Sequence, residues 1–166
     1  MEKRLILAGG CFWGVEAYYQ KLKGIVTTNV GYANGNIENP TYEQVCSGVA
    51  THAEVVEVIY NSNEITLEKV LEHFFRMINP FSLNKQGNDI GIQYRSGLYY
   101  ENNDDKKIIE EFIKKEQTKY NKKIVVEVEE LQNYYLAENY HQDYLLKNPT
   151  GYCHIDMSLI RPEEMK

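Results

Sequence analysis

Hydrophobic and polar residues recur along the chain in two patterns, one typical of β-strands and the other of amphipathic helices. Runs rich in β-branched residues predict strands at residues 4–8, 25–32, 52–60, 96–100 and 124–128. Apolar positions three or four residues apart predict helices at residues 12–22, 67–77, 104–121 and 138–147, with a helical turn near 42–45. Thr66 is the expected N-cap of the second helix.

These strands and helices do not alternate strictly, which favours an α+β fold with a mixed sheet in a two-layer sandwich. Residues 1–166 contain no repeats, linkers or low-complexity segments, so a single domain is expected. Residues 79–91 form a predicted loop whose length suggests a functional role. An irregular C-terminal tail begins at about residue 148.

Charge and composition narrow the possible functions. The chain has 18 Lys+Arg against 24 Asp+Glu, and its net charge of −6 argues against an electrostatic nucleic-acid site. No apolar run approaches the ~20 residues that cross a membrane, and no signal peptide is recognised, so a cytoplasmic protein is expected. Three cysteines without a Cys-x-x-Cys pair, and histidines without i, i+4 spacing, predict neither a metal site nor another bound cofactor.

Cys11 occupies the strongest local position for a reactive thiol. It follows the first predicted strand and the Gly9-Gly10 turn, and it opens a predicted helix. The N-terminus of a helix carries partial positive charge and free N–H groups, which lower a cysteine pKa and favour the thiolate. The alternative is a buried structural cysteine beside the sheet.

Glu54 is the candidate acid. Alternation in its predicted strand puts Glu54 on the same face as Val56 and Val58. Glu57 lies on the other face and is expected to contact solvent. A carboxyl group buried among valines has a raised pKa and can donate a proton near neutral pH. The alternative is a solvated side chain at the end of the strand.

Two large aromatic residues, Phe12 and Trp13, follow Cys11 directly. Adjacent residues of a helix point in different directions, so the two rings cannot both contact the same part of the core. One interpretation is that they form the apolar wall of a pocket next to the thiol. The other is ordinary packing of one ring and partial exposure of its neighbour.

Further polar candidates lie in loops. Tyr42 follows a turn, and the segment at residues 86–96 offers a carboxylate, a phenol and a guanidinium in Asp89, Tyr94 and Arg95. Asx-turn chemistry accounts for Asp89. It does not account for Tyr94 and Arg95 together, which favours a functional site at this loop–strand junction.

The remaining cysteines differ in their surroundings. Cys153 lies beyond a Pro/Gly turn in the irregular tail, where a resolving thiol could move toward a partner. Alternatively, it is a surface thiol without a function. Cys46, in the segment Val45-Cys46-Ser47-Gly48, is interpreted as a small buried residue.

The segment Gly10-Cys11-Phe12-Trp13-Gly14-Val15-Glu16 resembles the active-site motif of the A-type peptide methionine sulfoxide reductases. Similar segments follow in the same order over nearly the whole chain, at residues 31–35, 39–42, 45–48, 52–54, 86–89, 93–96, 141–144, 148–149 and 151–153. Any one segment could match by chance, whereas the ordered set is highly specific. The resemblance implies a two-layer α+β sandwich related to the ferredoxin-like plait, and the S epimer of methionine sulfoxide, free or in peptides, as substrate.

The resemblance also implies roles for individual residues. Cys11 would attack the sulfoxide sulfur while protonated Glu54 delivers a proton to the departing oxygen. Tyr42 and Tyr94 would hydrogen-bond that oxygen, and Asp89 would help to hold the polar network. Phe12 and Trp13 would contact the methyl group of the substrate.

Cys153 would then attack the Cys11 sulfenic acid and form a disulfide, which thioredoxin or a small dithiol would reduce. The partners implied are therefore oxidised proteins, free methionine sulfoxide and thioredoxin, with the chain acting as a monomer. No cysteine follows Cys153, so a second relay disulfide is not expected.

The sequence departs from the family pattern at two places. The segment before Pro80 lacks the usual His-Asp, and Thr51 replaces a glycine before His52. Neither change affects the proposed chemistry. The competing hypotheses are a thiol peroxidase, which would place an arginine rather than a protonated carboxyl group beside the sulfur, and a redox-sensing module that does not turn over substrate.

Overall fold

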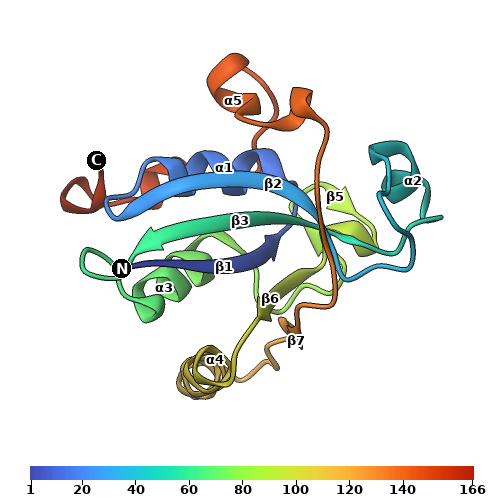
Figure 1. The fold of residues 1–166 in the computed structure, drawn as a ribbon. Helices are drawn as coiled ribbons and strands as arrows, with labels where there is room; N and C mark the ends of the chain where they lie inside the picture. Colours follow the sequence, from blue (N-terminus) through green and yellow to red (C-terminus); the bar gives the residue numbers. More distant parts are fainter.

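A curled six-stranded sheet forms the framework of the protein, whose computed structural model describes all residues from 1 to 166 (Figure 1). Its strands lie in the order β7-β6-β1-β3-β2-β8, and only β6 and β7 are parallel. A separate hairpin pairs β4 with β5. The strands are β1 (Glu2–Gly9), β2 (Ile25–Ala33), β3 (Ala53–Asn61), β4 (Lys85–Gln86), β5 (Asp89–Ile90), β6 (Ser96–Tyr100), β7 (Glu127–Glu130) and β8 (Tyr134–Leu136). The predicted α+β class with a mixed sheet is confirmed.

Five α-helices and four 3₁₀ turns connect these strands. The predicted N-cap is confirmed, because Thr66 accepts a hydrogen bond from the backbone N–H of Lys69 at 3.1 Å. The helices are too short or too polar to span a bilayer. The helical elements are α1 (Phe12–Gln20), α2 (Tyr42–Ser47), α3 (Leu67–Met77), α4 (Asn103–Gln117), α5 (Tyr144–Lys147), η1 (Ile92–Tyr94), η2 (Asn139–His141), η3 (Met157–Leu159) and η4 (Pro162–Glu164).

The main hydrophobic core lies on the face of the sheet that carries Val56. Tyr18 of α1, Phe74 of α3 and Ile109 of α4 all pack into this core. A smaller cluster, which includes Val55, lies on the opposite face of β3. Because hydrophobic stabilisation scales with the apolar area buried, the larger cluster fixes how α1 sits on the sheet, and with it the position of Cys11.

Strand pairing brings three distant segments to one place. Leu7 of β1 pairs with Val56 of β3, and Gly9 at the end of β1 pairs with Ser96 at the start of β6. Because β1 is antiparallel to both neighbours, its C-terminal end lies next to the N-terminal ends of β3 and β6. The residues after Gly9 therefore meet Glu54 and the turn that precedes Ser96.

The prediction of one helix over residues 138–147 is wrong. The segment forms two short turns, η2 and α5, separated by Asp143 in the left-handed region with φ 55°. Gln142 bonds both backbone groups of Val30, at 2.8 and 2.9 Å, and Asp143 N–H donates to Glu16 at 2.9 Å. Because these hydrogen bonds go to β2 and α1, the segment cannot form a regular helix of its own.

The C-terminal tail, residues 148–166, is irregular as predicted, but it is packed against the rest of the molecule. Ile155 and Ile160 belong to the main core. Arg76 of α3 donates two hydrogen bonds to the Glu164 carboxylate, at 2.7 and 2.9 Å. Both ends of the chain lie at the same side of the molecule (Figure 1).

Candidate active site

Cys11 is the N-cap residue of α1, at the point where the chain leaves β1. The preceding turn needs a glycine, because Gly10 has φ +92° and a Cβ there would lie 2.7 Å from the Cβ of Gln86. This close approach packs the β4–β5 hairpin against the turn. Cys11 itself is only 7% exposed.

Cys11 does not rest as a thiolate, contrary to the sequence prediction. Burial raises the pKa of the Cys11 thiol well above its ordinary value, and the nearby Glu54 raises it further. A hydrogen bond from the backbone of Trp13 acts in the opposite direction but is the smaller effect. In addition, one free donor of the helix terminus is not available to the sulfur, because Phe12 N–H donates to Glu54 Oε1 at 3.2 Å.

Glu54 is the most completely buried acid of the site, with 1% exposure. Burial raises the pKa of this carboxyl to about 8, against the opposing hydrogen bond from Phe12. Its second oxygen, Oε2, is buried without a hydrogen-bond partner. At neutral pH the side chain is therefore a carboxylic acid with one unoccupied oxygen. The predicted face is confirmed, since Val56 belongs to the main core while Glu57 pairs with Arg4 at 2.8 Å.

Tyr42 and Tyr94 supply two phenols near Glu54. Burial raises the pKa of both side chains above the ordinary value, and the charge of Glu54 contributes in each case. Both hydroxyls therefore remain protonated and can donate hydrogen bonds. Asp89 lies within electrostatic range of Cys11 and Glu54, and its Oδ2 accepts a hydrogen bond from Tyr152 at 2.9 Å.

Phe12 and Trp13 separate as expected for adjacent helical residues. Phe12 is buried in the main core, and Trp13 is partly buried at its edge. Trp13 stacks on Tyr144 with ring centroids 3.8 Å apart, and its indole N–H donates to His141 Nδ1 at 3.0 Å. The His141 ring also lies 4.4 Å from the Tyr42 ring. His141 was missing from the predicted site, although its motif at residues 141–144 was the signal that could have identified it.

Cys153 lies against α1 beside Gly14. The position of a Cβ on Gly14 would be only 3.1 Å from Cys153 Sγ, so the missing side chain leaves the space that this thiol fills. Cys153 also lies within electrostatic range of Cys11. The structure thus brings together the two thiols that the sequence placed 142 positions apart at opposite ends of the chain. All three cysteines are free.

Comparison with known proteins identifies this arrangement. Residues 3–166 match the model of the family described as peptide methionine sulfoxide reductase. The chain belongs to this family. Its activity is accordingly the reduction of methionine sulfoxide.

Individual relatives are similar to the reductase in sequence or structure over most of its length. It is 50% identical over 163 residues to the peptide methionine sulfoxide reductase MsrA of Ureaplasma parvum, which covers 98% of this chain and 99% of the relative. The reduced form of Mxr1 from Saccharomyces cerevisiae superposes with a TM-score of 0.87 at 43% identity, covering 92% of this chain and 88% of Mxr1. A further Mxr1 structure, solved in complex with Trx2, has a TM-score of 0.62 at 32% identity, covering 86% and 84%.

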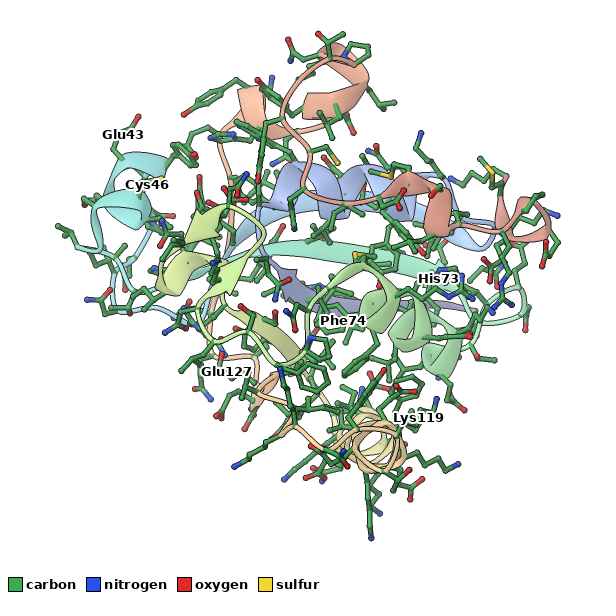
Figure 2. The ribbon with its side chains drawn as sticks, turned by 180° about the vertical axis from the view of Figure 1, so that it is seen from behind. Glu43, Cys46, His73, Phe74, Lys119 and Glu127 are labelled. Carbon is green, nitrogen blue, oxygen red and sulfur yellow. The ribbon has the colours of Figure 1, made fainter.

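Cys46 of the reductase is exposed, so its prediction as a buried residue is wrong. It lies near Glu43 on α2 (Figure 2). This helix has six residues, and its only buried side chain is Val45. A hydrogen bond to Cys46 contributes to the raised pKa of the Tyr42 phenol. Cys46 therefore lies at the edge of the site that contains Tyr42.

Cys153 of the reductase is also reached from outside. A cavity of about 490 Å³ opens between α1 and the C-terminal tail, and Cys153 contributes to its wall together with Leu145, Leu146 and Met157. Cys11 does not line this cavity. No group of three or more His, Cys, Asp or Glu side chains is arranged to hold a metal ion.

Proposed function

We propose that the reductase acts on the S epimer of methionine sulfoxide, free or in peptides, with Cys11 as nucleophile and Glu54 as acid. The observation that carries the proposal is the buried carboxyl of Glu54, whose Oε2 has no partner and whose pKa is raised to about 8. A sulfoxide oxygen leaves only when it is protonated, and an acid that keeps its proton at neutral pH supplies that proton.

The first step balances without protons from solvent. Cys11 Sγ attacks the sulfoxide sulfur, the oxygen ends on Cys11 as a sulfenic acid, and the thioether is released as methionine. The proton on that oxygen comes from Glu54. The resulting carboxylate takes the proton that the Cys11 thiol loses as it attacks, so Glu54 returns to its neutral form. The thiol is oxidised and the sulfoxide is reduced by two electrons.

Tyr42 and Tyr94 are proposed to hold the substrate oxygen. Their raised pKa values keep both hydroxyls as donors, as the charge that develops on the oxygen requires. Trp13 and Phe12 are proposed to contact the methyl group, and Asp89 to order the polar side through Tyr152. If the site holds the oxygen and the methyl group on different sides of the sulfur, only one configuration at that sulfur fits. This arrangement favours a single epimer.

Cys153 is proposed to resolve the sulfenic acid. Its Sγ attacks Cys11 Sγ, a disulfide forms, and the hydroxyl leaves as water. Thioredoxin is proposed to return both thiols by dithiol–disulfide exchange, which is supported by the solved complex of Mxr1 with Trx2. The position of Cys153 beside Gly14 supports a short path to Cys11.

We infer that residues 1–166 form one domain with a ferredoxin-like plait at its core. The antiparallel order β6-β1-β3-β2 supports this interpretation, as do α1 between β1 and β2 and α3 between β3 and β6. Both helices pack into the same core cluster, as a two-layer sandwich requires. We also propose that the reductase is a monomer, which is supported by a site whose residues all come from one chain, and that it is cytoplasmic. Size-exclusion chromatography tests the oligomeric state, and cell fractionation tests the location.

The decisive experiment supplies racemic methionine sulfoxide with dithiothreitol and follows both epimers by chiral chromatography. The S epimer should disappear and the R epimer should remain. Cys11→Ser should consume neither, whereas Cys46→Ser should retain activity. Consumption of both epimers at equal rates would contradict the proposed pocket.

A further inference from the structure

The His154 side chain packs against glycines near the two thiols of the proposed reaction, Cys11 and Cys153. A Cβ on Gly10 would lie 2.9 Å from its Nε2, and a Cβ on Gly87 would lie 3.3 Å from its Cβ. The imidazole is thus held between the turn before Cys11 and the β4–β5 hairpin. None of the roles proposed above uses this side chain.

The hydrogen bonds of His154 determine which ring nitrogen carries the proton. Nε2 lies 2.9 Å from the carbonyl oxygen of Gly9. A carbonyl oxygen can only accept, so Nε2 must be the protonated nitrogen and the donor in this bond. In the neutral ring Nδ1 then carries a lone pair. This nitrogen is buried and has no hydrogen-bond partner.

The free nitrogen borders the same space as the resolving thiol. The point where Gly14 would carry a Cβ is 3.5 Å from His154 Nδ1 and 3.1 Å from Cys153 Sγ. This space lies on α1, one helical turn from Cys11. Cys153 Sγ and the unoccupied lone pair of His154 therefore border the same point on α1.

Cys153 needs a base for its reaction. Its Sγ lies 3.4 Å from the carbonyl oxygen of Ile155, which can only accept, so this bond uses the S–H of Cys153 as the donor. The nucleophile in disulfide formation is the thiolate. Glu54 is committed to Cys11 and is protonated, and Asp89 accepts a hydrogen bond from Tyr152.

We propose that His154 Nδ1 accepts the thiol proton of Cys153 when Cys153 attacks the Cys11 sulfenic acid. The S–H bond of Cys153 breaks, an S–S bond forms, and the S–O bond of Cys11 breaks. His154 passes the proton to the departing hydroxyl, which leaves as water. The inference rests on the proposed roles of Cys11 and Cys153.

The surroundings of His154 suit a base. Burial lowers the pKa of the imidazole from its ordinary value, against the opposing effects of its bond to Gly9 and of Asp89. The ring is therefore neutral at pH 7. The titratable groups around it are Asp89 from the hairpin, and Tyr152 and Cys153 from the tail. None of them is a cation that would compete for the lone pair.

His154→Gln tests the proposal, because the glutamine amide can donate to Gly9 but cannot accept a proton. In single turnover, methionine release should stay within about twofold of the wild type. Disulfide formation should slow by about 10²-fold, within the range of general base catalysis, and a sulfenic acid-reactive probe should label Cys11. His73→Gln removes a different buried histidine, on α3 far from the site (Figure 2), and should leave disulfide formation unchanged.

The pH profile distinguishes a base from a structural residue. Between pH 6 and 8 the wild-type rate of disulfide formation should be nearly constant, whereas that of His154→Gln should rise about tenfold per pH unit, as uncatalysed thiolate attack requires. His154→Ala should regain a fast rate with added imidazole, saturably. A His154→Gln enzyme that forms the disulfide at the wild-type rate and with the wild-type profile would overturn the role of His154. A wild type that releases methionine but forms no Cys11–Cys153 disulfide would instead overturn the role of Cys153, and this proposal with it.

Discussion

The backbone N–H of Phe12 donates to Glu54 Oε1 across 3.2 Å, so the acid of the site occupies a donor of the helix that carries the nucleophile. Burial is the main reason why this cysteine at a helix N-terminus rests as a thiol, and the contact places the charge of Glu54 close enough to add to that effect. Burial raises the pKa of both Cys11 and Glu54, and the charge of an ionised Glu54 raises the pKa of Cys11 further. The free enzyme therefore holds two protons at one place. In the proposed reaction Glu54 passes its proton to the sulfoxide oxygen and then takes up the proton of the Cys11 thiol.

Glu54→Gln should lower the single-turnover rate of sulfoxide reduction by about 10²- to 10⁴-fold, the range typical of general acid catalysis. Glutamine keeps the shape and the acceptor for Phe12 N–H but cannot deliver a proton. The wild-type rate should fall as pH rises through about 8, because the protonated acid is the active form. Glu57→Gln, on the opposite face of β3, is the matched control and should retain the rate. If Glu54→Gln formed the sulfenic acid at the wild-type rate, a group other than Glu54 would have to deliver the proton.

The same buried acid should make stability depend on pH. The pKa of Glu54 is about 8 in the folded protein, whereas unfolded glutamate titrates near 4.3. The folded state thus binds this proton more tightly, so the contribution of Glu54 to stability is fully present below about pH 4 and is lost as pH rises toward 8. Glu54→Gln should therefore raise Tm, relative to wild type, more at pH 8 than at pH 5. Thermal unfolding at both pH values measures this, and an equal difference at each would contradict the raised pKa.

Cys153→Ser should release one methionine per enzyme and then stop when thioredoxin is the reductant, because the Cys11 sulfenic acid has no internal thiol to meet it. Mass spectrometry of the wild type after substrate treatment should show a Cys11–Cys153 disulfide. Cys46→Ser should behave as the wild type. A bridge between Cys11 and Cys46 would assign the resolving role to the exposed thiol of α2.

Elements that depend on local pattern were predictable from the sequence. Helix α3 begins and ends where the apolar spacing and Thr66 indicate, and Glu54 lies on the predicted face of β3 because side chains alternate in any strand. The family motifs predicted the candidate residues as a set. What they could not give was the path between Cys153 and Cys11, which depends on how the tail packs against Gly14.

Two of the wrong predictions share a cause, since they depended on a partner distant in the sequence. Gln142 bonds to β2 instead of supporting a helix, and the chain breaks at Asp143. The pKa of Cys11 depends on burial and on Glu54, 43 positions away. Cys46 is exposed because α2 buries only Val45. A sequence pattern contains no information about these distances.

Glu16 links α1 to the segment that covers Trp13. Its carboxyl accepts hydrogen bonds at 2.9 Å from the Asp143 N–H and from the Thr28 hydroxyl, and burial raises its pKa to about 7. Asp143 directly precedes Tyr144, whose ring stacks on Trp13. The carboxyl therefore fixes one wall of the proposed substrate site through the backbone, without contacting substrate.

Glu16→Ala should consequently raise KM several-fold while the rate at saturating substrate changes little. The substitution removes the acceptor of two partly buried donors, the Asp143 N–H and the Thr28 hydroxyl, so the stack of Tyr144 on Trp13 should loosen. Trp13 is the only tryptophan, so its fluorescence should shift to longer wavelength as water reaches the indole. Glu16→Gln retains an acceptor for the Asp143 N–H and should recover most of both properties. A KM and an emission maximum that remain at the wild-type values in Glu16→Ala would show that this segment is held by other contacts.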